Sequence, residues 1–396
     1  MTEKKTSSKD IMLAHSKAKV DYYQRYLERY LSIMSVVKSV DEVNIFDVFC
    51  GRGVYDDGGL GSPIRTVGTV KKVISDHSSG LQVNLFFNDA ETSYVERVKQ
   101  YINEHYPEYR EYCSIVYWSV QADSLLEKLC KFLPKTGFRT KNFLFIDPYG
   151  YKDINKQTFE RLMRNENTEI LLFLPISFMH RFTRYAFKED ANQGAMRLRE
   201  FIEDFFPKEH KVRSDEPIDV KEYIDALTEA FSFGGKYYAT SYFIERDCRN
   251  HFALFFICHN LLGLEKAIEA KWSLDEADGN GFHQPKESLQ KDLFDDFFQE
   301  ENRKEHFEEL KTLLLSYLSS GRKANSDIYR FILKHGYLPK HANAVLRHLQ
   351  DNKMIKVTLF SGKEPRKHSF YINYNDSENR SVPKAFIELN NENNKD

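Results

Sequence analysis

The chain has 396 residues, of which 41% are hydrophobic, and a formal net charge of −2 at pH 7. This length allows two or three domains. The near-neutral charge excludes a uniformly basic nucleic-acid-binding protein, although it is compatible with a local basic surface. The five cysteines form no C-x-x-C pair, which argues against a disulfide framework. Neither a signal-peptide pattern nor the run of about 18 apolar residues that a spanning helix needs is found. We therefore expect a cytoplasmic protein that does not enter membranes.

Helices and strands are expected to alternate over the first two thirds of the chain. A long amphipathic helix is predicted over 11–40, because Tyr and Leu recur there at three- to four-residue spacing. Apolar runs of the kind that a parallel sheet buries on both faces follow it. The predicted strands are one ending near Asp47, then 81–87, 113–120, 143–146 and 169–175, with a closing pair at 237–244 and 252–258. This order predicts an α/β fold with a doubly wound, Rossmann-like sheet.

Changes of composition predict the domain boundaries. The charged, helical stretch inside the sheet domain is a candidate lid, and three helices followed by a hairpin have the order of a winged helix. The carboxyl-terminal tail is expected to be too polar to fold. The predicted parts are an N-terminal helical cap (1–40), a sheet domain (41–275) with a helical insertion (179–233), a linker (276–295), a winged-helix domain (296–380) and a disordered tail (381–396).

Acidic side chains follow the ends of the first four predicted strands: Asp47, Asp89, Asp123 and Asp147. Ligands of open α/β sheets bind in the crevice outside the carboxyl ends of the strands, so the series predicts one shared pocket. Taken singly, Asp89 is better explained as a helix N-cap than as an acceptor for a ribose hydroxyl. Asp123 is either a cap for the helix that follows it or an acceptor for an adenine amine.

Two glycines, Gly51 and Gly53, follow the first strand. Without a Cβ, they let the backbone approach a ligand and take left-handed torsions, and the next helix amino terminus favours negative charge. A loop under a cofactor carboxylate and a tight strand-to-helix turn explain this pattern about equally well.

The segment Asp147-Pro148-Tyr149 is the one closest to chemistry. Its carboxylate and proline carbonyl can accept both hydrogens of an amine and hold the nitrogen lone pair toward an electrophile, while Tyr149 offers a face for a planar base. A plain Asp-Pro turn is the structural alternative. No metal site is expected, because the strand-end acids lack an obvious metal cluster with a lysine.

The predicted winged helix carries basic side chains on one helix face and in the turn between two strands, 354–360 and 367–374. Contact with DNA or RNA and docking of a protein are about equally compatible with its mixed charge. The candidate contact residues are Lys340, Asn343, Arg347, Lys363, Arg366 and Lys367.

Segments spread over nearly the whole chain carry a resemblance to a known family. They are 16–27, 46–53, 61–63, 145–150, 168–172 and 252–259, together with the winged-helix region. In these segments the chain resembles the three-Cys-motif partner proteins, within the Rossmann-like S-adenosylmethionine-dependent methyltransferases.

The resemblance implies a methyltransferase sheet with a winged helix, S-adenosylmethionine as cofactor, and a separate three-Cys-motif protein as partner. It also implies roles for individual residues. Asp47, Gly51 and Gly53 would lie under the methionine part of the cofactor, Asp89 would hold its ribose, Asp123 its adenine, and Lys19 and Tyr22 would close the pocket. Aminomethyltransferases usually carry two prolines after the catalytic acid, whereas a single proline, Pro148, follows Asp147 here.

From these patterns we predict a methyltransferase-like protein that acts on a nitrogen of a nucleic acid or nucleotide-like substrate together with its partner. The alternative is a non-catalytic adaptor. It would bind DNA or a partner through the winged helix and keep the sheet as a scaffold or ligand sensor.

Overall fold

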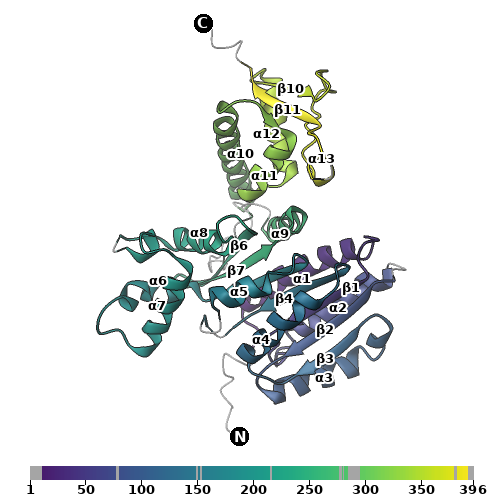
Figure 1. Cartoon of the computed structure of the whole chain (residues 1–396), viewed down its shortest axis with the longest axis vertical. Helices are drawn as coiled ribbons and strands as arrows, with labels where there is room; N and C mark the ends of the chain where they lie inside the picture. The colour runs from purple at the N-terminus through teal and green to yellow at the C-terminus, as the bar shows by residue number, and fades with distance from the viewer. Residues whose placement is uncertain are drawn as a thin grey trace. The chain divides into compact units, whose positions relative to one another are not determined.

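The computed structural model describes residues 11–76, 80–148, 150–151, 154–214, 216–275, 279, 281–283, 295–378 and 381–390; for 76 and 295–303 it describes the backbone alone. The chain divides into two compact units. The sheet unit comprises 1–274 and 280–285, and the winged-helix unit comprises 275–279 and 286–396. Figure 1 shows the helices and strands of each unit.

The sheet unit is built on an eight-stranded sheet of order β3-β2-β1-β4-β5-β7-β6-β8. Its first five strands run parallel, and β7 is antiparallel to both β5 and β6. The predicted doubly wound sheet with an antiparallel closing strand is therefore confirmed. The bounds are β1 Glu42–Asp47, β2 Gln82–Asn88, β3 Ser114–Trp118, β4 Thr140–Ile146, β5 Thr168–Leu174, β6 Tyr238–Asp247, β7 Asn250–Cys258 and β8 Gly281–Phe282.

Helices cover both faces of this sheet (Figure 1). One face carries α1 (Ala14–Met34), α2 (Ser62–Asp76), α3 (Thr92–His105) and α9 (Leu261–Leu274). The other face carries α4 (Ala122–Phe132), α5 (Lys156–Leu162) and α8 (Val220–Phe231). Burial on both sides explains why the central strands read as unbroken apolar runs.

The first helix is part of the core of the sheet unit. Its tyrosines recur every three to four residues and pack on β4, with ring centroids 4.6 Å apart for Tyr23 and Phe145 and 5.4 Å apart for Tyr26 and Phe143. Tyr23 and Tyr26 are fully buried. Aromatic side chains bury large areas, so this packing holds α1 firmly across the strands.

Three asparagines at equivalent positions fix the register of the central strands. Asn44 of β1 pairs in register with Asn84 of β2 and with Asn142 of β4. The Asn84 amide donates to the Asn44 carbonyl oxygen at 3.0 Å, and the Asn44 amide donates to that of Asn142 at 3.1 Å. A slip of either strand would leave these buried amides unpaired, which is costly.

The insertion between β5 and β6 is helical. It consists of α6 (Ile176–Ala186), α7 (Gln193–Phe205), a short 3₁₀ turn (Lys211–Arg213) and α8. Apolar side chains of α6, α7 and α8 join the core on the face that α4 and α5 cover. The insertion is therefore anchored to the sheet through this shared core.

The winged-helix unit has three helices and a three-stranded sheet of order β10-β11-β9. The helices are α10 (Asp295–Ser319), α11 (Asn325–Lys334) and α12 (Pro339–Asp351), and α13 (Tyr374–Ser377) is one short turn. The strands are β9 Lys323–Ala324, β10 Ile355–Leu359 and β11 Ala385–Leu389.

Two sequence predictions about this unit are wrong. The second wing strand, predicted at 367–374, is not a strand, because His368 and Tyr371 adopt left-handed backbone torsions with φ of +62° and +58°. The strand that pairs with β10 is β11, from the tail predicted to be disordered. It folds because Ala385 and Ile387 alternate with more exposed side chains and are buried in the core. Residues 391–396 of that tail lie outside the described residues.

Candidate functional site

A cavity of about 350 Å³ opens at the carboxyl ends of β1, β4 and β5. Residues from α1, the Gly51 loop, the Asp147-Pro148 strand end and β7 line it, and we call it the loop cavity. The strand-end segments of β1 and β4 thus meet in one place, as the topology of an open sheet requires.

The two glycines of the loop have different roles. Gly51 lies in the left-handed region at φ +59°, and a Cβ built on it would contact nothing within 4 Å. Gly53 has φ +72°, and its Cβ would lie 2.6 Å from a methyl of Val98. Gly53 is therefore required by helix packing, whereas Gly51 leaves space beside the loop cavity.

The Asp89 carboxylate ties two loops together. It accepts the Gly51 amide at 3.0 Å and the Glu91 amide at 2.9 Å, and only 4% of the residue is exposed. The second bond orders the start of α3, in the manner of a helix cap. Asp89 therefore holds the glycine loop in place.

Asp47 lies beneath the loop cavity and does not line it. The residue is fully buried, and neither carboxylate oxygen has a hydrogen bond of normal geometry within the described residues. Burial raises the pKa of Asp47 to about 7; Asp147 adds to the rise, while the nearby Ser62 hydroxyl and Lys19 oppose it. Its ionised form therefore depends on cations in its surroundings.

Lys19 forms an ion pair with Asp147 inside the loop cavity. Its Nζ also lies 4.6 Å from the ring centroid of Phe173. Phe173 stacks on Phe252 at 5.3 Å, and Phe252 stacks on His15 at 5.1 Å. Burial and Arg246 lower the pKa of His15 to about 4, so this ring is neutral at pH 7. The cavity thus combines carboxylates with an aromatic wall.

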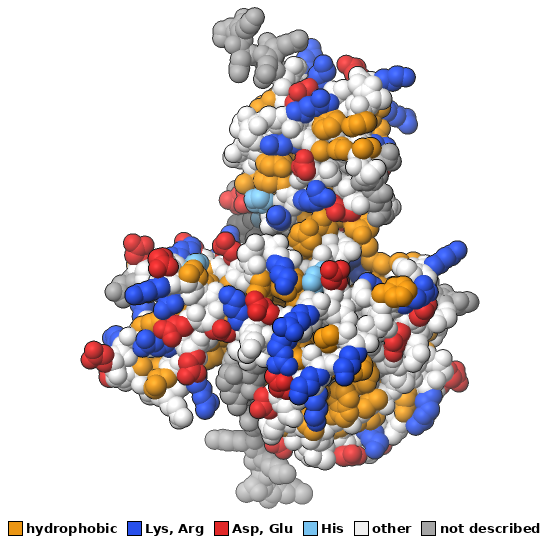
Figure 2. Space-filling model, viewed as in Figure 1, with side chains coloured by type: hydrophobic (Ala, Val, Ile, Leu, Met, Phe, Trp, Pro, Cys, Tyr) orange, Lys and Arg blue, Asp and Glu red, His pale blue; other side chains and the backbone are white. Residues whose placement is uncertain are grey.

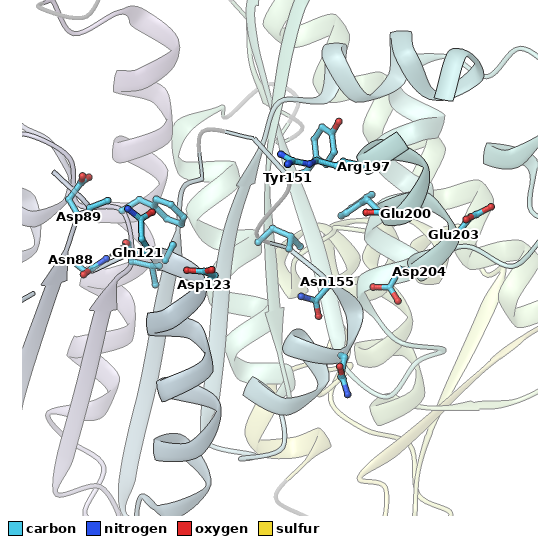
Figure 3. Close-up of a pocket in the computed structure, with 17 residues that line it drawn as sticks. Asn88, Asp89, Gln121, Asp123, Tyr151, Asn155, Arg197, Glu200, Glu203 and Asp204 are labelled. Carbon is cyan, nitrogen blue, oxygen red and sulfur yellow. Dashed lines mark hydrogen bonds between the residues drawn. The ribbon is translucent and has the colours of Figure 1, made fainter. Parts of the chain in front are cut away.

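A second, wider cavity of about 910 Å³ adjoins the first at Phe49, which lines both. Figure 3 shows Asn88, Asp89, Gln121 and Asp123 at the strand ends on one side and side chains of α7 on the other. The labelled α7 residues are Arg197, Glu200, Glu203 and Asp204. Five acidic residues and one arginine line this wide cavity within the described part of the chain, so it disfavours phosphate groups.

Asn88 is a site residue that sequence reasoning missed. It is buried, donates to the Val48 and Val120 carbonyl oxygens at 3.0 Å each, and accepts the Val120 amide at 3.1 Å. These bonds join the ends of β1 and β3 across β2. The sequence signal that could have indicated this role is the position of Asn88 directly before Asp89, at the end of a predicted strand.

Of the remaining predicted pocket residues, some line a cavity and others do not. Tyr22 lines neither cavity: its hydroxyl donates to the Ala267 carbonyl oxygen at 3.3 Å, and its ring stacks on Tyr242. The three-residue step from Lys19 turns it toward α9 and the core, so the structure does not place it at the pocket entrance. Asp123 lies in the first turn of α4 and lines the wide cavity, and Pro148 lines the loop cavity. Tyr149 lies outside the described residues.

The candidate contacts of the winged helix are mainly exposed. Lys340 and Arg347 project from α12, Asn343 is half-buried, and Lys363 and Arg366 lie in the turn after β10. Lys367 is also exposed but pairs with Asp351 at 2.7 Å. Figure 2 shows Lys and Arg interspersed with Asp and Glu on the visible face of this unit.

The described residues contain neither a candidate metal site nor a candidate membrane-spanning helix. No group of three or more His, Cys, Asp or Glu is arranged to hold a metal ion. No helix in the same part of the chain is both long and apolar enough to cross a membrane.

A comparison with family models gives one match, over most of the winged-helix region. A family model described as the GMT-like wHTH domain matches residues 283–359, which supports the winged-helix assignment. No curated protein is similar to the sequence at a significant level.

Similar solved structures include three methyltransferases. An O-methyltransferase from Bacillus cereus in complex with SAH is 12% identical with a TM-score of 0.31 and covers 59% of this chain and 80% of its own. TomG from Streptomyces achromogenes, an O-methyltransferase in complex with SAM, is 13% identical with a TM-score of 0.30. The match covers 60% of this chain and 79% of TomG. The human methyltransferase 10 domain containing protein is 9% identical with a TM-score of 0.31. The match covers 62% of this chain and 83% of the human protein. The strand order of the sheet, rather than these distant similarities, identifies the fold.

The buried Asp47 carboxyl predicts a pH-dependent stability. Its folded-state pKa of about 7 exceeds the unfolded value of about 3.9, so its contribution is complete below about pH 4 and is lost as pH rises through 7. Asp47→Asn should therefore gain stability relative to the wild type by about 3 kcal/mol between about pH 5 and pH 8.

Urea unfolding of both proteins at the two pH values measures this difference. Burial also raises the pKa of Glu169 to about 7, so Glu169→Gln should gain stability relative to the wild type over the same pH range and serves as a positive control. A gap between wild type and Asp47→Asn that is equal at both pH values would contradict the assignment.

Proposed function

We propose that the sheet unit is an S-adenosylmethionine-dependent methyltransferase that acts on a nitrogen of a nucleic acid or nucleotide-like substrate. The observation that carries this proposal is the pair of adjoining cavities at the carboxyl ends of β1 to β5, joined at the Gly51 loop and closed by the Asp147-Pro148 strand end.

The side chains present fit this cofactor. S-adenosylmethionine carries a sulfonium and an ammonium but no phosphate, and it supplies an electrophilic methyl group when bound. The acidic lining of the wide cavity repels the phosphate groups of a dinucleotide or a nucleoside triphosphate, whereas the adenosine part of this cofactor carries no phosphate. Gly51 leaves the loop open to the methionine part, and Asp123 at the rim suits the adenine amine.

The acceptor nitrogen would lie at Asp147. Its carboxylate and the Pro148 carbonyl can accept two hydrogens of an amine and so aim the nitrogen lone pair. Phe173 and Phe252 supply an apolar wall on which a planar base can stack. This arrangement supports catalysis by positioning, without a covalent enzyme intermediate.

We also propose a binding role for the winged-helix unit. Lys340, Arg347, Lys363 and Arg366 are exposed and are the candidate contacts to nucleic acid or to a three-Cys-motif partner protein. The family-model match over this region supports a winged helix, and phosphate contacts by exposed Lys and Arg would make binding depend on salt.

Cofactor binding is tested by adding a Cβ at Gly51. Gly51→Ala should weaken binding of S-adenosylmethionine at least about tenfold, because the new methyl group enters the space beside the loop cavity and strains a left-handed residue. Isothermal titration calorimetry of the full chain measures the affinity.

The matched control is Gly58→Ala. Gly58 also has a positive φ, of +81°, with nothing within 4 Å of a built Cβ, yet it lines neither cavity. Equal affinities for the two variants, or no binding to the folded wild type, would contradict the proposed cofactor site.

The acceptor role of Asp147 is tested by Asp147→Asn. Loss of the carboxylate should reduce methyl transfer by about a hundredfold or more, while cofactor affinity changes little, because positioning of the acceptor is lost. Transfer of a labelled methyl group to a mixture of nucleotides and single-stranded oligonucleotides measures the reaction.

Asp56→Asn is the control for this experiment, since Asp56 is an exposed acid of the same region and pairs with Arg97 at 3.0 Å. If transfer survives in Asp147→Asn, the assigned role is wrong. If the wild type binds the cofactor but transfers no methyl group, the non-catalytic adaptor is the better description.

A further inference from the structure

A primary amine of the chain itself occupies the acceptor position of the loop cavity. Lys19 Nζ forms an ion pair with Asp147, the carboxylate that would hold the substrate amine. We propose that Lys19 is a methylation site: when no other acceptor is present, its Nζ receives the methyl group of S-adenosylmethionine. This inference rests on the proposed function of the same site.

The surroundings of Lys19 differ from those of the lysines on the surface. Its side chain is 13% exposed, and it is the one lysine among the described residues that line the loop cavity. Lys71 and Lys72 also pair with carboxylates, but their side chains are 45% and 65% exposed and they line neither cavity. An amine enclosed beside the glycine loop is placed to meet a methyl donor.

Two further interactions favour both the unmethylated and the methylated form of Lys19. The Nζ lies 4.6 Å from the ring centroid of Phe173, and a methylated ammonium retains its charge and gains apolar contact with such a ring. The buried Asp47 interacts electrostatically with Lys19 and favours a cation here when its carboxyl group is ionised. Methylation would therefore preserve the electrostatic interactions of Lys19 with Asp147 and Asp47.

The transfer is balanced in atoms and charge. The Lys19 ammonium first gives a proton to Asp147, because a protonated amine has no lone pair. The Nζ then attacks the methyl carbon, so that the N–C bond forms as the S–C bond breaks. S-adenosylhomocysteine leaves, the new secondary ammonium carries the positive charge, and Asp147 passes its proton to water.

Peptide mass mapping of the full chain after incubation with S-adenosylmethionine tests the proposal. The peptide that contains Lys19 should gain one methyl group. Lys19→Arg, which keeps the cation, should gain none at this position, and Asp147→Asn should react at least about tenfold more slowly. Lys17→Arg is the matched control, since Lys17 is exposed on the same helix and lines neither cavity.

A second readout does not depend on methyl transfer. Bound S-adenosylhomocysteine should protect Lys19, but not Lys17, from acylation by acetic anhydride, because the product fills the cavity around Lys19. Unchanged acylation of Lys19 in the presence of the bound product would overturn the proposal.

Calorimetry on the same preparation separates the two claims. If S-adenosylmethionine binds and the Lys19 peptide stays unmodified, the Lys19 inference is wrong while the proposed cofactor site stands. Equal modification of Lys17 and Lys19 would also overturn it, since that marks unselective chemistry. If the folded protein does not bind the cofactor at all, both claims fail.

Discussion

The structure of the site depends on a carboxylate that is buried and, among the described residues, has no hydrogen bond of normal geometry. Asp47 ends the central strand β1, and its pKa is raised by burial to about 7. An isolated buried charge is costly, and a nearby cation offsets that cost. Lys19 is the cation that opposes the rise, and it reaches this place because α1 packs its tyrosines across β4. Helix packing and site electrostatics are therefore linked.

The same packing defines the shape of the site. With α1 fixed, Lys19 and His15 form one wall of the loop cavity, and Phe173 and Phe252 of β5 and β7 form another. Asp89 holds the glycine loop between this cavity and the wide cavity. The α7 helix, attached through the core of the insertion, then adds acidic side chains to a space that disfavours phosphates. A cationic, phosphate-free nucleoside such as S-adenosylmethionine meets all of these conditions.

Much of the sheet could be predicted because buried parallel strands leave a strong local signal, and because acids at Asp47, Asp89 and Asp147 end such strands. The aromatic wall and the α7 wall could not, since they join side chains distant in sequence through tertiary packing that no local pattern encodes. The tail strand β11 was missed for a related reason: its alternation is short, and polar residues follow it. The supposed strand at 367–374 has apolar residues but also two left-handed residues, which periodicity does not reveal.

The central claim is that the two adjoining cavities form one binding site for S-adenosylmethionine. A crystal structure of the full chain with S-adenosylhomocysteine tests it most directly. We expect the adenosine part in the wide cavity near Asp123 and the sulfur in the loop cavity between the Gly51 loop and the Lys19–Asp147 pair. A ligand bound elsewhere, or both cavities empty at saturating ligand, would contradict it.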